Sequence, residues 1–82
     1  MTMKIGARVS TILFGDIHKG IITRLSAATT LGEPDSGEVV FDDGSHIWTG
    51  FGEFKVISYC SKEEMLTHCS FIVRCAAIRY EP

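Results

Sequence analysis

The sequence lacks the features that mark secreted, membrane-spanning and strongly basic proteins. Its three cysteines, Cys60, Cys69 and Cys75, are an odd number at irregular spacings, which argues against a disulfide framework; we therefore expect a cytoplasmic protein. The most apolar stretch, residues 69–78, is broken by Arg74 and is far shorter than the roughly 20 residues of a membrane-spanning helix. Eight basic against ten acidic residues give a net charge of −2, so broad non-specific binding to nucleic acid is not expected.

The sequence also lacks the common catalytic and cofactor-binding motifs. It has no phosphate-binding glycine loop, no dinucleotide-binding glycine fingerprint and no His-Glu-x-x-His sequence. The spacing of Cys60, His68, Cys69 and Cys75 matches no zinc finger, so we expect no metal. Acidic residues and histidines near the turns could form an acid/base site, but turn chemistry explains them more simply: Asp16, His18, Asp42, Asp43, His46 and Glu53. We expect no cofactor and no enzymatic activity.

Length and composition predict one small folded domain over residues 1–82. With 45% hydrophobic and 22% charged residues, the chain has the composition of a globular protein rather than of a disordered one. A domain of 82 residues leaves much of its surface exposed, so its core is marginal unless something adds to it. Homo-oligomerisation, most simply as a dimer, would add to it.

Five segments have the composition and alternation of β-strands, and turn residues separate them. We expect strands at residues 4–14, 20–25, 38–41, 46–49 and 54–59. The sequence Asp-Asp-Gly-Ser at residues 42–45 predicts a tight hairpin, because Asp-Gly tolerates the positive φ angles of such turns. The longest loop is expected at residues 27–37, and Gly50 and Gly52 predict a tight turn around Phe51.

The C-terminal residues have a helical pattern. Ser61 and Glu64 have the spacing of a capping box, so we expect a helix to start there and to run over about residues 61–79, after a barrel over residues 1–59. One apolar stripe would pack on the barrel: Met65, Cys69, Ile72, Val73, Ala76 and Tyr80. A second stripe of Phe71, Cys75 and Ile78 points elsewhere. The alternative is a short helix followed by a strand, since residues 71–73 favour β-structure.

The order of these features over residues 6–58 resembles the Tudor-like branch of the SH3-like barrels. The similar segments are residues 6–9 at the entry, 19–22 at the second strand and 39–45 at the hairpin. The resemblance implies a mainly β fold, a five-stranded SH3-like barrel with a C-terminal helix. Turn chemistry itself dictates part of this pattern, so the resemblance says more about fold than about function.

Some Tudor domains hold a methylated cation in a cage of aromatic faces. The resemblance places Phe41 and Asp43 at a cage aromatic and its acidic partner, and places Phe14 and His18 near two further cage positions. The last aromatic position is Ile47, and Trp48 would lie on the opposite face of the strand. The alternative is that most of these aromatics fill the core, while Trp48 and Phe51, beside a glycine-rich turn, are exposed and anchor an interface.

The leading hypothesis is therefore a non-enzymatic binding module. It would receive a peptide, a modified side chain or a small ligand at one end of the barrel, through Phe14, His18, Phe41, Asp43, Trp48 and Phe51. A second hypothesis is an assembly protein that dimerises through Phe71, Cys75 and Ile78. A third is nucleic-acid binding by an aromatic and a basic face: Lys4, Arg8, Lys19, Arg24 and Lys55.

Overall fold

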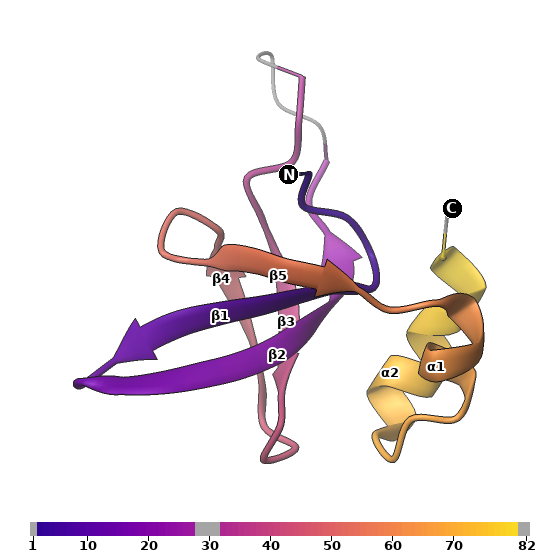
Figure 1. The fold of residues 1–82 in the computed structure, drawn as a ribbon. Helices are drawn as coiled ribbons and strands as arrows, with labels where there is room; N and C mark the ends of the chain where they lie inside the picture. Colours follow the sequence, from indigo (N-terminus) through magenta and orange to yellow (C-terminus); the bar gives the residue numbers. More distant parts are fainter. Residues whose placement is uncertain (1, 28–31, 81–82) are drawn as a thin grey trace.

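The chain folds into one five-stranded antiparallel sheet followed by short helices (Figure 1). The computed structural model describes residues 2–27 and 32–80. The strands are β1 (Ala7–Leu13), β2 (Asp16–Leu25), β3 (Ser36–Phe41), β4 (His46–Gly50) and β5 (Lys55–Tyr59). The helices are α1 (Lys62–Leu66), α2 (Phe71–Ala76) and the 3₁₀ turn η1 (Ala77–Arg79). The mainly β fold predicted from the sequence is confirmed.

The sheet has the strand order β4-β3-β2-β1-β5, so β4 and β5 are its two edges. Register shifts between Arg8 and Val9, and between Ile22 and Arg24, are irregularities of the kind that bend and twist strands. Within the described residues, no strand pairing joins β4 to β5. The sheet is therefore not closed, and the predicted barrel is not confirmed.

The hairpins follow local turn chemistry. The β3–β4 hairpin at residues 42–45 is confirmed, with Gly44 at a φ of +90°. The β1–β2 hairpin is longer than predicted, because β2 starts at Asp16, and only Phe14 and Gly15 form its loop, at φ angles of +52° and +84°. Two positive φ angles match the right-handed twist of the flanking strands. Of the predicted loop at residues 27–37, residues 28–31 lie outside the described ranges.

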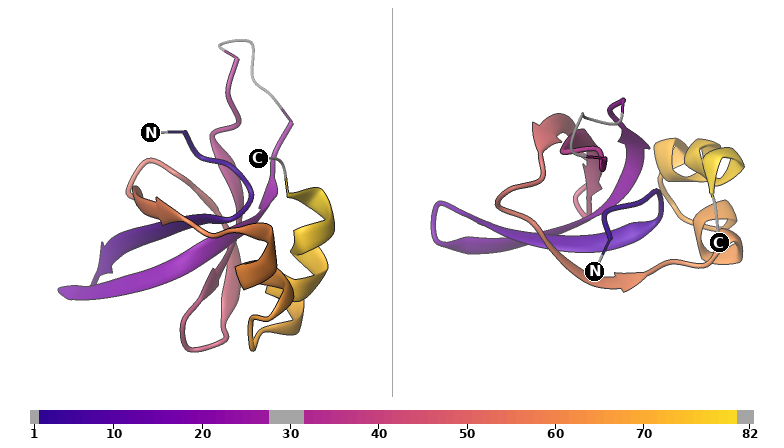
Figure 2. Two further views of the ribbon diagram at one scale, coloured as in Figure 1. Left: turned by 45° about the vertical axis from the view of Figure 1, so that its right-hand side comes forward. Right: turned by 90° about the horizontal axis from the view of Figure 1, so that it is seen from above.

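The two faces of the sheet bury two separate clusters. Val9, Ile22 and Val39 are fully buried on the inner face, where Phe41 and Phe51 join them. Ile21 and Val40 pair across β2 and β3 one position along, so they point to the outer face. There they pack with α1, α2 and η1 in a second cluster, with Met65, Val73, Ala76 and Ala77. The helices thus cover one part of the outer face beside β2 (Figure 2).

The predicted single helix over residues 61–79 is wrong, and so is the alternative strand at residues 71–73. The capping box of Ser61 and Glu64 is confirmed, but α1 ends at Leu66 and α2 starts after Ser70. Side chains between them bond to the backbone: the Thr67 hydroxyl donates to the Glu63 carbonyl (3.0 Å), and the Ser70 N–H donates to His68 Nδ1 (2.9 Å). The Thr67 N–H also keeps its helical bond to Glu63, whereas the bond of the Ser70 N–H to a side chain replaces a helical one and interrupts the helix there.

The break divides the predicted apolar stripe. Met65, Val73 and Ala76 are buried as predicted, but Cys69 lies in the connection between the helices and is exposed. No helix among the described residues is both long enough and apolar enough to cross a membrane.

Candidate functional site

Three of the six predicted ligand-binding residues meet at one end of the sheet. His18, Phe41 and Asp43 line a hollow of about 470 Å³, which we call the loop-end hollow; its other lining residues are Ile17, Lys19 and Asp42. The His18 ring stands edge-on to Phe41, with centroids 6.1 Å apart. Phe41 stacks on Phe54 at 6.3 Å and is only 8% exposed. Because neighbouring rings cover Phe41, it has little free face to offer a cation.

Asp43 stabilises the hairpin turn rather than facing the hollow as a free carboxylate. Its Oδ1 accepts hydrogen bonds from the Ser45 hydroxyl (2.6 Å) and the Ser45 N–H (2.9 Å). These bonds lower the pKa of Asp43. The bonds follow the ordinary role of aspartate in a turn. The loop-end hollow therefore lacks the open aromatic cage that the resemblance implies.

Phe14 and Phe51 lie apart from the loop-end hollow. Phe14 is fully exposed at the tip of the β1–β2 hairpin, where Ile12 and Ile17 also expose most of their side chains. Phe51 is 7% exposed and belongs to the inner core. The Phe51 N–H donates to the Asp35 carbonyl (2.8 Å), and the end of the Phe51 ring lies beside Gly37 of β3. The expected exposure of Phe51 is therefore wrong, because this turn directs the ring inward.

Trp48 lines a different surface, which we call the Trp48 groove. The groove measures about 410 Å³, and its described lining residues are Lys4, Ile5, Arg24, Leu25, Trp48 and Arg79. Trp48 is 57% exposed, as expected from its position near the turn. The groove lies between the sheet, the segment before β1 and the end of η1, so residues far apart in the sequence form it.

Strand register places Arg24 and Trp48 on the same face. Trp48 of β4 pairs with Glu38 of β3, and Glu38 pairs with Arg24 of β2. Directly paired residues share a face, so the three side chains form a row across three strands. Glu38 and Val40 are two positions apart along β3, so their side chains point to the same face of the sheet, and Val40 faces the helices. The row therefore continues the outer face beyond the part that the helices cover.

Glu38, in the middle of this row, is the less exposed of the two charged residues in it. Its side chain is 16% exposed, and its Oε1 accepts a hydrogen bond from the buried Thr23 hydroxyl (2.7 Å). His46 Nδ1 lies 3.3 Å from Glu38 Oε2. Arg24 Nε lies 3.7 Å from Glu38 Oε1, a separation longer than a hydrogen bond. Arg24 thus lies near the Glu38 carboxylate without donating a hydrogen bond to it.

The other two cations of the Trp48 groove, Lys4 and Arg79, differ in whether they already contact another side chain. The Lys4 ammonium lies 4.6 Å from the centroid of the Tyr59 ring, which is a cation–π contact. The side chain of Arg79, at the end of η1, has no hydrogen bond or ion pair to another residue in the described ranges. The guanidinium of Arg79 is therefore the most available cation of the groove.

The predicted basic face does not form as one surface. Lys4 and Arg24 both line the Trp48 groove, while Lys19 lines the loop-end hollow and Lys55 lines a separate hollow near Ile12.

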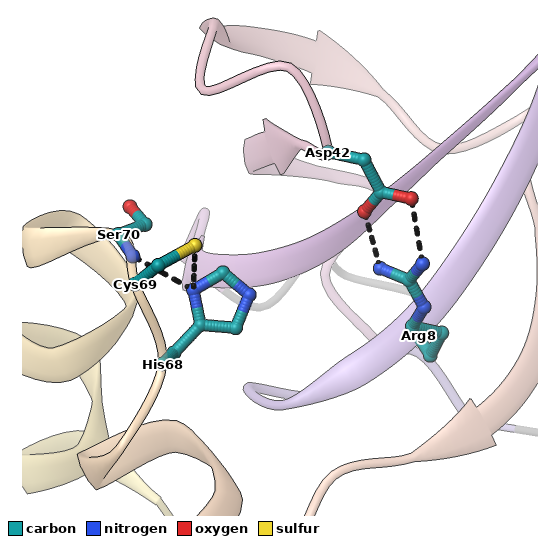
Figure 3. A network of polar contacts seen from close by, with 5 residues as sticks. All are labelled: Arg8, Asp42, His68, Cys69 and Ser70. Atoms are coloured by element: carbon teal, nitrogen blue, oxygen red, sulfur yellow. Dashed lines mark hydrogen bonds and ion pairs between the residues drawn. The ribbon is translucent and has the colours of Figure 1, made fainter.

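Arg8, the fifth residue of the predicted basic face, pairs with Asp42 (Figure 3). Its Nη1 and Nη2 donate to the two carboxylate oxygens of Asp42 at 2.7 and 2.8 Å. The Arg8 hydrogen bonds lower the pKa of Asp42, and the same pairing raises the pKa of Arg8. The sequence pattern does not predict that Arg79 and Trp48 line one groove, because only the docking of the helices brings both residues there.

Phe71, Cys75 and Ile78 lie on one exposed side of α2 and η1. Phe71 is 70% exposed and Ile78 is 83% exposed, and Cys75 is exposed between them. The Arg74 guanidinium lies 5.8 Å from the centroid of the Phe71 ring. The structure thus brings these three predicted interface residues together at the surface.

Polar residues near the helix break do not form a metal centre. His68 Nδ1 lies 3.9 Å from Cys69 Sγ (Figure 3). Within residues 2–27 and 32–80, no three histidine, cysteine or acidic side chains are grouped so that they could hold a metal ion. Comparison of the chain with protein-family models, with curated proteins and with solved structures finds no significant match.

Proposed function

We propose that the chain is a small non-enzymatic binding module and that its working surface is the Trp48 groove. Its ligand is a peptide, a modified side chain or a small molecule. The observation that carries this proposal is a half-exposed tryptophan in a groove with three cations. Volumes of about 300–1,000 Å³ are typical of ligand sites, and the groove falls within that range.

An exposed tryptophan in a concave surface favours recognition over a purely structural role. Tryptophan offers a large rigid contact area and is enriched at the residues that dominate binding energy. Phe51 shows the alternative in the same chain, since its ring is buried in the inner core. Trp48 instead leaves 57% of its surface to solvent.

The proposed module is an SH3-like, Tudor-like barrel with a helical extension. Support comes from the strand order, in which β1 to β4 follow one another and β5 returns to pair with β1. The two register shifts also support this proposal, because irregularities of this kind bend strands, as a barrel requires. Recognition in this chain uses the outer face near Trp48, because Phe41 is covered by its neighbours at the loop end.

The test is a ligand screen that follows every backbone amide and the single indole N–H by NMR. Ligands that bind should shift the Trp48 indole together with Arg24 and Arg79. Trp48→Ala should abolish these shifts. Ile47→Ala removes the adjacent, 43% exposed side chain on the opposite strand face and should leave them unchanged. Ligands that shift only residues of the loop-end hollow, or that bind Trp48→Ala normally, contradict the proposal.

A second candidate function is assembly into a symmetric homodimer through Phe71, Cys75 and Ile78. It is favoured by the exposure of all three side chains on one side of the helices. A second copy is the partner we propose, because covering apolar surface supports a domain with a marginal core. Sedimentation of the reduced protein should give a dimer that Phe71→Glu dissociates. Leu66→Glu, an equal change of charge on α1, should not. A monomeric wild-type protein excludes this candidate.

A further inference from the structure

The Trp48 groove combines an aromatic face with guanidinium donors. Within the described residues its lining contains no acidic side chain, although the chain has ten acidic residues against eight basic ones. Three of the eight basic residues therefore line one groove in an overall acidic protein. A ligand that is anionic at one end has a local electrostatic reason to bind here.

The available donors of the groove suit a phosphate group. Arg24 and Arg79 are both arginines, whose planar donors match phosphate oxygens in pairs. Glu38 offsets part of the Arg24 charge, because a carboxylate oxygen of Glu38 lies 3.7 Å from Arg24 Nε. Arg79 has no competing partner among the described residues. The phosphate is therefore expected at Arg79, with support from Arg24.

The strand spacing sets the distance between the aromatic and the cation on the sheet. Arg24 and Trp48 are separated by one intervening strand, which places their backbones about 10 Å apart. Both side chains rise from the same face, so their ends can contact two parts of one ligand. A ligand that bridges them needs a flat group for the indole and an anionic group a short distance away.

We propose that the Trp48 groove binds a nucleotide unit, with the base stacked on the Trp48 indole and the phosphate held by Arg79 and Arg24. This inference rests on the proposed binding function of the same groove. A free nucleotide and a single-stranded nucleic acid present the same chemistry. Stacking on an aromatic side chain is tolerant of base identity, so recognition of nucleotides does not need base-specific hydrogen bonds.

The experiment titrates the protein with thymidine monophosphate and with an oligothymidylate of about eight nucleotides, a length within the site size of small single-strand-binding folds. Trp48 is the only tryptophan, so its fluorescence and its indole N–H signal report directly on the groove. We expect both signals to change on binding. Tighter binding of the oligonucleotide identifies a single strand as the preferred source, and equal affinities identify the free nucleotide.

Matched variants test the two halves of the site. Neither Trp48 variant keeps the tryptophan signals, so their binding is followed through the backbone amide shifts of Arg24 and Arg79. Trp48→Ala should weaken binding at least about fivefold, while Trp48→Phe keeps a ring and should recover part of the loss. Because both arginines hold one phosphate, the proposal predicts a slope of about −0.7 for log affinity against log salt, and Arg79→Gln should bring this slope closer to zero. Lys62→Gln makes the same change of charge on α1, outside the groove, and should leave the slope unchanged.

The outcomes separate failure of this inference from failure of the proposed function. If nucleotides leave the Trp48 signals unchanged while a ligand of another class, such as an acidic peptide, shifts them, the nucleotide inference is wrong and the binding function stands. Oligonucleotide affinity that is equal in Trp48→Ala, or equally reduced in Lys62→Gln and Arg79→Gln, also overturns the inference. If no ligand of any class shifts Trp48, the proposed function itself fails.

Discussion

Replacement of Met65 by alanine tests how the helices are anchored to the sheet. Met65 is fully buried between the helices and the outer face of the sheet, in one cluster with Ile21, Val40 and Val73. A Cβ atom added at Gly6 would lie 3.1 Å from Met65 Sδ, so the segment before β1 also packs closely on this side chain. Little space exists into which the surroundings could relax if the side chain were shortened.

The expected cost follows from this burial. Truncation of a fully buried methionine to alanine costs about 2–5 kcal/mol, because the lost contacts are not replaced and a cavity remains. That is a large share of the roughly 5–15 kcal/mol by which a small domain is stable. In a domain of this size a loss of about 3 kcal/mol lowers the melting temperature by roughly 12–24 °C. Leu66, the next residue of α1, is 51% exposed and provides a matched control.

The assay is urea denaturation of the wild type, Met65→Ala and Leu66→Ala, followed by circular dichroism. We expect the free energy of unfolding to fall by about 3 kcal/mol for Met65→Ala and to change by less than about 0.5 kcal/mol for Leu66→Ala. A loss below 1 kcal/mol for Met65→Ala, or equal losses for the two variants, would refute the buried position of this side chain.

Two further predictions concern titratable groups. Because Arg8 lowers the pKa of Asp42, this pair should add stability above the ordinary carboxyl pKa and lose it as the pH falls through the lowered value. Asp42→Asn should therefore lower the free energy of unfolding by about 0.5–1 kcal/mol near neutral pH, since the pair is partly exposed, and should leave it unchanged in strong acid. Urea denaturation of both proteins across this pH range measures the difference. An equal loss of stability at every pH would contradict the prediction. Burial, assisted by the Glu64 carboxylate, raises the pKa of the Cys60 thiol, so at neutral pH a disulfide reagent should modify exposed Cys69 before Cys60. Mass spectrometry shows which cysteine is modified first. The difference between the modification rates of Cys69 and Cys60 should become smaller as the pH rises. Faster modification of Cys60 would count against the structure.

The parts of the fold that were predictable from sequence depend on few neighbouring residues. The hairpin at residues 42–45 follows from Asp-Gly chemistry, and the start of α1 follows from the reciprocal bonds of Ser61 and Glu64 at 3.0 and 3.1 Å. The inner and outer positions of β2 follow from the alternation of a strand. In each case the physical cause lies within a few positions of the chain.

The break between the helices was not predictable from the apolar pattern. That pattern continues through Cys69, so a single stripe fits a continuous helix. The Ser70 N–H decides otherwise, because it donates to His68 Nδ1 rather than to a helical carbonyl four residues earlier. This effect depends on the position of the His68 ring. Periodicity does not encode that local competition.

Phe51 and Trp48 show the same limit for the candidate site. Both aromatics flank one glycine-rich turn, and the sequence pattern predicts the same exposure for both. The Phe51 N–H bonds to the Asp35 carbonyl of a distant segment, and this contact helps to seat the ring under Gly37. An alanine at Gly37 would bring its Cβ within 2.8 Å of Phe51 Cζ, so the missing side chain makes room for the ring. No glycine makes comparable room for the Trp48 ring among the described residues, and 57% of the Trp48 surface is exposed.

Anchoring of the helices and formation of the Trp48 groove are one structural event. Helix docking covers Ile21 and Val40 on the outer face but leaves the row of Arg24, Glu38 and Trp48 open beside them. The same docking delivers Arg79 to the edge of that row, since η1 continues directly from α2. The sheet alone would carry a tryptophan and one arginine that already lies beside a carboxylate. The docked helices add a cation that has no competing partner among the described residues. The C-terminal segment is short and has little helical stability of its own, so it completes the proposed site only by packing Met65, Val73 and Ala76 against Ile21 and Val40 of the sheet.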